Sequence, residues 1–154
     1  MNQITIRPAM SDDLPILLHF EQQLIKAERP FDPTLGEDPI HYYDLEKMIH
    51  AAEVRLVVAE LDGEIIGSGY ARIEMAKPYL RHKKHAYMGF MYVAPEHRGK
   101  GVNNHIITVL KEWTALHHIE EIRLDVYTDN ISAIRAYEKA GFVQLMTEMR
   151  LPPG

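Results

Sequence analysis

The segment 85–118 constrains the fold of this chain more than any other part of the sequence. It begins with an apolar, strand-like stretch at 85–93, which is followed by a turn that carries Gly99 and Gly101. After the turn, apolar residues recur at helical spacing as far as about His118: Val102, Ile106, Val109, Leu110, Trp113 and Leu116. The pattern therefore predicts a strand that passes through a glycine turn directly into an amphipathic helix.

This junction has the properties of a phosphate-binding turn. The first turn of a helix leaves backbone N–H groups without partners, and the helix dipole adds positive charge there. Glycine lets the backbone approach a ligand closely, and Arg98 and Lys100 add charge. A Walker loop is excluded, because Gly99-Lys100 is followed by Gly101 where that loop needs Ser or Thr. The residues by themselves leave a phosphate site and a plain structural turn as alternatives.

The rest of the sequence predicts alternating strands and helices. Ser11 is the expected cap of the first helix, and Asp62-Gly63 predicts a hairpin. Gly141 suits the position after the last helix. Further strands are expected at 4–7, 55–60, 64–73, 121–127 and 142–151, and further helices at 11–27, 41–52 and 130–140. This order predicts one α/β domain over 1–154, with a mixed central β-sheet flanked by helices on both faces.

Composition excludes several classes of protein. The length of 154 residues suits a single domain, and the net charge of −5 argues against a general nucleic-acid binder. The chain has no cysteine, so it has no disulfide and no thiolate ligand or nucleophile. No stretch approaches the roughly 18 apolar residues of a membrane span, and the first residues lack the core of a signal peptide. We therefore expect a cytoplasmic protein that does not bind membranes. The nine histidines show no metal-site spacing, so no metal is expected.

At the glycine turn the sequence resembles a known family. The stretch YVAPEHRGKGV is similar to the central motif of the GCN5-related N-acetyltransferases (GNAT), in which an R/Q-x-x-G-x-G/A turn cradles the pyrophosphate of acetyl-coenzyme A. Arg98 and Gly101 match this motif, whereas Asn103 stands where the family has glycine or alanine. A second family motif is matched by Asn130-x-x-Ala133-Ile134-x-x-Tyr137-Glu138-Lys139-x-Gly141-Phe142. The resemblance covers nearly the whole chain and implies the GNAT acyl-CoA N-acyltransferase fold.

The resemblance also implies where acetyl-coenzyme A binds. The fourth strand would hold the pantetheine arm and polarise the thioester carbonyl, and the glycine turn would hold the pyrophosphate. The helix of the second motif would contact the cofactor arm and the sulfur. The residues implied are Met91, Tyr92, Val93, Arg98, Gly99, Lys100, Gly101, Val102, Asn103, Asn130, Ala133 and Tyr137.

Acetyl transfer to an amine needs a neutral nucleophile, donors for the oxyanion and a proton for the thiolate. By resemblance, Tyr137 is the general acid; alternatively, it only packs its helix onto the sheet. Many family members carry a glutamate on the fourth strand, but residues 85–92 contain no carboxylate. Glu74, His85 and a water relay from a more distant carboxylate are therefore the alternatives for the general base.

Two charged segments have open interpretations. Residues 28–44 are acidic and aromatic, which suits a cationic amine through charge and cation–π contact; an ordinary acidic loop is the alternative. The acceptor candidates there are Glu28, Phe31, Asp32 and Tyr43. The basic stretch 81–84 is either a solvated turn or a contact for an anion such as the adenosine 3′-phosphate.

The sequence thus predicts an acetyl-coenzyme A-dependent N-acetyltransferase. The acceptor would be a primary amine of a small molecule or peptide, and transfer would be direct, since no cysteine can carry an acetyl group. The alternatives are a non-catalytic acyl-coenzyme A-binding sensor, and O-acyl transfer or the use of a longer acyl chain. A homodimer is an expectation from the family resemblance.

Overall fold

A computed structural model describes residues 3–154, and its centre is a five-stranded sheet in the order β1-β2-β3-β4-β5. The strands are β1 (Thr5–Pro8), β2 (Val54–Leu61), β3 (Glu64–Met75), β4 (Lys84–Val93) and β5 (Ile122–Arg123). The first four strands pair antiparallel, whereas β5 runs parallel to β4. The mixed sheet expected from the sequence is therefore confirmed.

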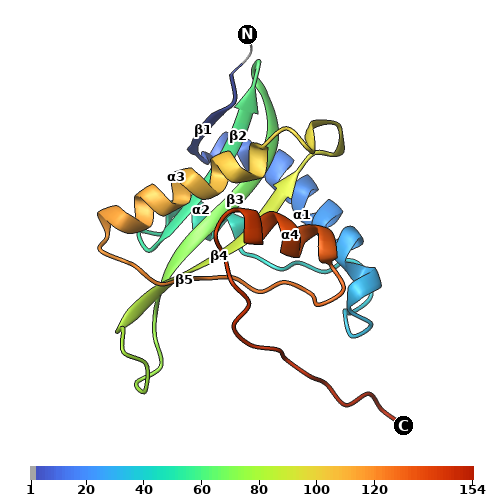
Figure 1. Ribbon diagram of the computed structural model, residues 1–154. Helices are drawn as coiled ribbons and strands as arrows, with labels where there is room; N and C mark the ends of the chain where they lie inside the picture. Colours follow the sequence, from blue (N-terminus) through green and yellow to red (C-terminus); the bar gives the residue numbers. More distant parts are fainter. Residues whose placement is uncertain (1–2) are drawn as a thin grey trace.

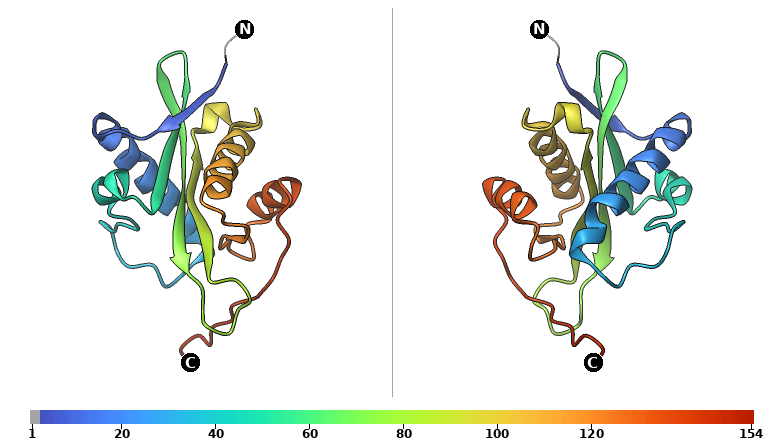
Figure 2. Two further views of the ribbon diagram at one scale, coloured as in Figure 1. Left: turned by 90° about the vertical axis from the view of Figure 1, so that its left-hand side faces the viewer. Right: turned by 90° about the vertical axis from the view of Figure 1, so that its right-hand side faces the viewer.

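Helices cover both faces of this sheet (Figure 2). One face carries α1 (Leu14–Glu28) and α2 (Leu45–His50), and the other carries α3 (Val102–Leu116) and α4 (Ile131–Lys139). Each face has its own buried cluster, because alternate strand residues point to opposite sides of a sheet. Phe20 of α1 packs with Tyr70 and Phe90 on the first face, and Ile106 of α3 packs with Ile66 on the second. Across residues 3–154, none of the helices combines the length and apolar character needed to cross a bilayer.

Residues close to each other in the sequence determine the β2–β3 hairpin and the start of α1. Asp62 and Gly63 both have positive φ, 51° and 78°, as a tight two-residue hairpin turn requires, so this prediction is confirmed. Ser11 is not the cap that was expected. Instead, a short 3₁₀ helix, η1 (Ser11–Asp13), precedes α1, and the Asp13 carboxylate accepts a hydrogen bond from Met10 N at 2.8 Å. Arg7 of β1 also donates to Asp13, at 2.8 and 3.0 Å, which ties the start of α1 to the sheet.

Three elements differ from the sequence prediction. The expected strand at 142–151 is wrong: this segment has no regular structure, Val143 and Leu151 are 86% and 95% exposed, and the tail runs away from the sheet (Figure 1). Within the described chain no strand pairs with it, and a strand needs a neighbour to satisfy its backbone. β5 is limited to two residues for the same reason. α2 begins only at Leu45, because Asp44 caps it through Lys47 N.

Candidate functional site

The strands β4 and β5 pair at only two positions and then diverge. Ala86 opposes Ile122 and Tyr87 opposes Arg123, after which β4 continues to Val93 while the chain beyond β5 is irregular. Beyond Tyr87, the edge of β4 that faces away from β3 therefore has no strand partner among residues 3–154, and we call this unpaired edge together with the segment 124–130 the slot.

Backbone groups of β4 face this slot. Tyr92 opposes Ser68 of β3, and Ala94 N donates to Ile66 O at 2.8 Å. In an antiparallel ladder, successive residues direct their backbone groups to opposite sides, so Met91 and Val93 face the slot. Next to them the β3–β4 register shifts, and Phe90 has a φ of 54°. The buried Ser68 hydroxyl donates to Phe90 O at 3.0 Å, which fixes this bulge in place.

The glycine turn lies at the far end of the slot. After the short helix η3 (Pro95–His97), Gly99 and Gly101 adopt φ values of 77° and 79°, and Gly101 is the N-cap of α3. No side chain caps this helix end, so its first N–H groups point out of the turn without a side-chain partner. The turn therefore has the geometry of an anion site.

Arg98 braces the turn against β4. Its Nε donates to Val93 O at 2.9 Å, and its guanidinium carbon lies 5.7 Å from the centroid of the Tyr92 ring. The remaining guanidinium N–H groups are left for a ligand, while Lys100 is exposed and Asn103 is partly buried in the first turn of α3. The structure therefore brings the turn residues chosen from the sequence together with Met91 and Val93.

The helix α4 brings the second motif to the same region. Asn130 caps it by accepting a hydrogen bond from Ala133 N at 3.3 Å. Tyr137 is partly buried, with its ring 5.9 Å from that of Phe142. Burial, and to a smaller degree the charge of Glu28, raises the pKa of Tyr137 to about 12. The tyrosine is thus a protonated hydroxyl throughout the neutral pH range.

The acidic segment reaches the slot from the opposite face of the sheet. The Tyr127 hydroxyl donates to Asp32 at 2.7 Å, and the rings of Tyr127 and Phe31 lie 6.1 Å apart. Hydrogen bonds from Thr34 and Tyr127 lower the pKa of Asp32, whereas burial and the Asp32 charge raise the pKa of Glu28. The candidates Glu28, Phe31 and Asp32 therefore border the segment 124–130.

Tyr43 is the acceptor candidate that belongs to the core. Its ring lies 5.6 Å from Tyr70 and 5.1 Å from Phe90, and burial raises the pKa of its hydroxyl. The side chain supports the face of the sheet that carries α1 and α2.

The two candidate bases do not face the slot. Glu74 and His85 oppose each other in the β3–β4 ladder, with His85 Nε2 3.5 Å from Glu74 Oε1. Arg72 holds the other carboxylate oxygen, with Nη2 2.8 Å from Oε2. The pair Glu74–His85 lies at the end of the β3–β4 ladder next to Ala86, where β4 is still paired with β5. The slot begins only after Tyr87, at the other end of the two β4–β5 pairs.

The structure adds a pair of residues that the sequence reasoning missed. The Tyr87 hydroxyl donates to Asp125 Oδ2 at 3.3 Å, across the point where the strands separate. Burial, and then the charge of Asp125, raises the pKa of Tyr87, so this hydroxyl keeps its proton. The sequence contained a signal for the position of Asp125. Ile122, Leu124 and Val126 alternate with it, so Asp125 is expected on the opposite face from these apolar residues.

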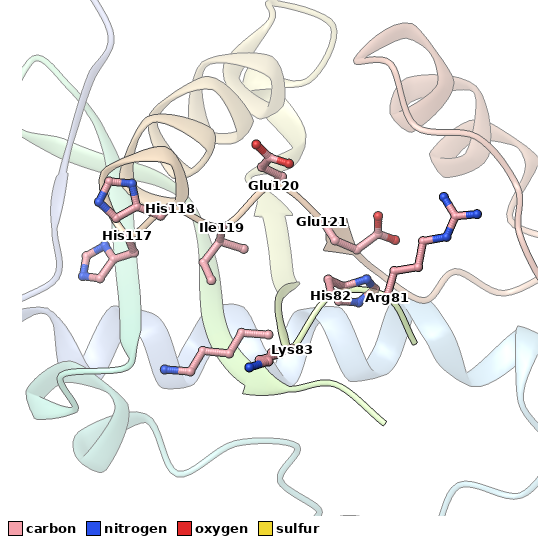
Figure 3. A pocket seen from close by; sticks show the side chains of 9 residues that line it. Arg81, His82, Lys83, His117, His118, Ile119, Glu120 and Glu121 are labelled. Carbon is pink, nitrogen blue, oxygen red and sulfur yellow. The ribbon is translucent and has the colours of Figure 1, made fainter. Parts of the chain in front are cut away.

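The basic stretch 81–84 belongs to a different hollow (Figure 3). This hollow of about 560 Å³ lies between the β3–β4 connection and the end of α3, and its lining includes Arg81, His82, His117 and Glu121. The 10 residues of β4 lie between this stretch and the glycine turn. A strand of that length spans about 30 Å, so the basic stretch is at the opposite end of the sheet from the turn.

One group of potential metal ligands occurs among residues 3–154. Atoms of Glu64, Glu96 and His97 lie within 4.8 Å of one another, and both glutamates are exposed. Exposed carboxylates of this kind are ordinary surface features, and we assign no metal to them.

Comparison with known sequences agrees with this geometry. A model of the acetyltransferase (GNAT) family matches residues 21–142. The N-alpha-acetyltransferase of Sulfurisphaera tokodaii is 28% identical over 128 residues, which make up 80% of this chain and 74% of that protein. Across four curated relatives, the part of each protein that matches this chain makes up from 20% to 74% of that protein's length.

Solved structures share the fold over nearly the full chain. The tetramutant of the BH1408 protein of Bacillus halodurans has a TM-score of 0.86 at 21% identity, covering 97% of this chain and 99% of that one. The aminoglycoside N-acetyltransferase AAC(6′)-Iy, in complex with the bisubstrate analogue CoA-S-monomethyl-acetylneamine, has a TM-score of 0.73 at 19% identity, covering 99% of both chains.

Proposed function

Because the chain belongs to the acetyltransferase (GNAT) family, we propose that it transfers the acetyl group of acetyl-coenzyme A to a primary amine in a ternary complex. The observation that carries this proposal is the slot along β4, which leads into the uncapped, positively charged start of α3. The similarity in fold to a protein solved with a coenzyme A bisubstrate analogue supports the same function.

The residues present fit the cofactor. A pyrophosphate at the turn would accept hydrogen bonds from the first N–H groups of α3 and from Arg98. The amide groups of a pantetheine arm would pair with the slot-facing backbone of Met91 and with the N–H of Val93, whose carbonyl is held by Arg98, as an added strand does at a sheet edge. The thioester would then lie near the bulge at Phe90, with α4 beside it.

Tyr137 would act on the sulfur as a hydrogen-bond donor. Its pKa of about 12 keeps the hydroxyl protonated. A thiol has a pKa of about 8.5, so full transfer of the tyrosine proton to the thiolate would be uphill by about 5 kcal/mol. The hydroxyl therefore stabilises the departing thiolate by a charge-assisted hydrogen bond, and the final proton comes from solvent.

The acceptor would be a cationic amine on a small molecule or a peptide. It would approach from the face that carries α1, where Glu28, Asp32 and Asp125 lie with tyrosine rings between them. Such a surface attracts a positive charge and packs against an apolar stem. One of the two similar proteins named above is an N-alpha-acetyltransferase and the other is an aminoglycoside N-acetyltransferase, so both an α-amine and an aminoglycoside amine are candidate acceptors.

The test is thiol release from acetyl-coenzyme A in the presence of spermidine, neamine, a lysine-containing peptide and a peptide with a free N-terminus. We expect turnover with at least one of these amines and a 10- to 100-fold lower kcat for Tyr137→Phe, about 1.4–2.7 kcal/mol of barrier. The cofactor Kd of this variant should not change, and Tyr79→Phe, an exposed tyrosine in the β3–β4 connection, is the matched control. Tight cofactor binding without turnover on any amine would favour the sensor and contradict this function.

A further inference from the structure

We propose that Asp125 is the carboxylate that meets the acceptor amine and takes the proton which the nitrogen loses as the amide forms. This role rests on the proposed acetyl transfer and assigns the general base, for which neither Glu74 nor His85 is suitably placed.

Asp125 lies beside the slot, on the side of the sheet from which the acceptor would approach. Ile122 and Leu124 pack into the cluster beneath α3, whereas Tyr127 reaches Asp32 on the other side of the sheet. Asp125 accepts a hydrogen bond from Tyr87, which packs against the cluster on the face that carries α1 and α2, so Asp125 shares this face, the acceptor face, with Tyr127. It lies two residues after Arg123, which forms the last β4–β5 pair. Asp125 is therefore the first acceptor-face side chain of this segment beyond the point where the slot opens.

The Asp125 carboxylate is held in one orientation and is accessible to a substrate. Tyr87 holds Oδ2 at 3.3 Å, and its raised pKa keeps it a donor, so Asp125 is oriented and its other oxygen is left for an amine. Within residues 3–154, no Lys, Arg or His nitrogen forms an ion pair with Asp125. The side chain is also exposed to solvent, so an incoming substrate can reach it.

Two of the neighbouring carboxylates already have other partners. Glu74 is held by Arg72, and Asp32 accepts hydrogen bonds from Tyr127 and Thr34. Glu28 is the main alternative to Asp125 as the general base. Burial raises the pKa of its carboxyl group, which makes Glu28 a stronger proton acceptor. It belongs to the end of α1, however, and not to either of the diverging strands that form the slot.

Proton transfer to Asp125 follows attack of the neutral amine on the thioester. The ammonium first loses a proton to solvent, and the nitrogen lone pair then forms a bond to the thioester carbon while the carbonyl π electrons move to oxygen. The nitrogen now carries an excess proton, which passes to Asp125. Collapse of the intermediate reforms the carbonyl and breaks the C–S bond, and the electron pair leaves with the sulfur beside Tyr137. Asp125 returns its proton to solvent.

The experiment compares Asp125→Asn, Asp125→Glu and Glu28→Gln, using the amine that the wild type acetylates best. Glu112→Gln, on the exposed side of α3, is the control for charge. We expect Asp125→Asn to lower kcat/KM for the amine at least 100-fold, within the usual range for a general base. The cofactor Kd and the unfolding temperature should stay near wild type, and Asp125→Glu should recover activity to within about 10-fold of the wild type.

The pH dependence separates proton transfer from simple attraction. If Asp125 accepts the proton, the deficit of Asp125→Asn persists at alkaline pH, where much of the amine is already neutral. A deficit that vanishes there would show only attraction of the ammonium and would overturn the proposal. An Asp125→Asn enzyme within threefold of the wild type, or a larger loss in Glu28→Gln, would also overturn it while leaving acetyl transfer intact. A wild type that acetylates no amine would refute both proposals.

Discussion

At the residue scale, Gly101 determines where the first N–H groups of α3 point. Its φ of 79° lies in the left-handed region, and a methyl group added there would meet only His105 Cδ2, at 4.0 Å. Glycine is therefore required by the backbone conformation and not by lack of space. Gly63 in the β2–β3 hairpin is in the same situation, with a φ of 78° and nothing within 4 Å.

This similarity gives a matched pair of substitutions. Gly101→Ala and Gly63→Ala should each destabilise the protein by about 1–2 kcal/mol, because each forces a side chain into left-handed backbone. Only Gly101→Ala should also weaken acetyl-coenzyme A binding, by about 10-fold or about 1.4 kcal/mol, since the relaxed turn misaligns its N–H donors. Urea unfolding and titration calorimetry measure the two effects. Equal cofactor affinity in the two variants would show that the turn does not hold the ligand.

At the scale of elements, the sequence predicted those whose form depends on their own residues. The hairpin follows from Asp62-Gly63, and α3 follows from its apolar spacing. Elements whose limits depend on a partner were predicted less well, namely α2, the two-residue β5 and the segment 142–151. The candidate site divides in the same way: the glycine turn is local in sequence, whereas Tyr87 and Asp125 meet only because β4 and β5 separate just after the pair Tyr87–Arg123.

Glu21 explains why the helix expected from residue 41 begins later. Its side chain is fully buried in α1; Oε1 lies 2.7 Å from His41 Nδ1, and Oε2 accepts hydrogen bonds from Tyr42 N and Tyr43 N at 3.0 and 2.9 Å. The carboxylate thus holds the segment 41–43 outside the helix and sets Tyr43 against the core.

Glu21→Gln should therefore destabilise the protein by about 1–2 kcal/mol, because a neutral amide replaces the charge-assisted hydrogen bonds that the carboxylate accepts from Tyr42 N and Tyr43 N with weaker neutral ones. Glu46→Gln, on the exposed surface of α2, should have almost no effect. Urea unfolding followed by Trp113 fluorescence measures both variants. A midpoint for Glu21→Gln equal to that of Glu46→Gln would mean that the segment 41–43 is held by its own packing.

At the scale of the whole molecule, the cofactor and the acceptor would reach the slot from opposite faces of the sheet. The glycine turn belongs to the layer of α3 and α4, while the acidic segment and Asp125 belong to the face that carries α1 and α2 (Figure 2). The slot between β4 and the segment 124–130 lies between the two sides. Such an arrangement suits two substrates that meet in a ternary complex, because neither has to leave before the other arrives.

A cofactor bound in this slot would bridge β4, α3 and α4, so it should stabilise the folded chain as a whole. At 100 times its Kd, acetyl-coenzyme A should add about 2.7 kcal/mol, which corresponds to a rise in Tm of about 5–10 °C for a chain of this size. Tyr137→Phe should retain the rise, and Gly101→Ala should lose part of it at the same ligand concentration. Thermal unfolding monitored by circular dichroism provides the measurement. Equal stabilisation by adenosine alone would place the binding energy outside the slot and contradict the assigned path along β4.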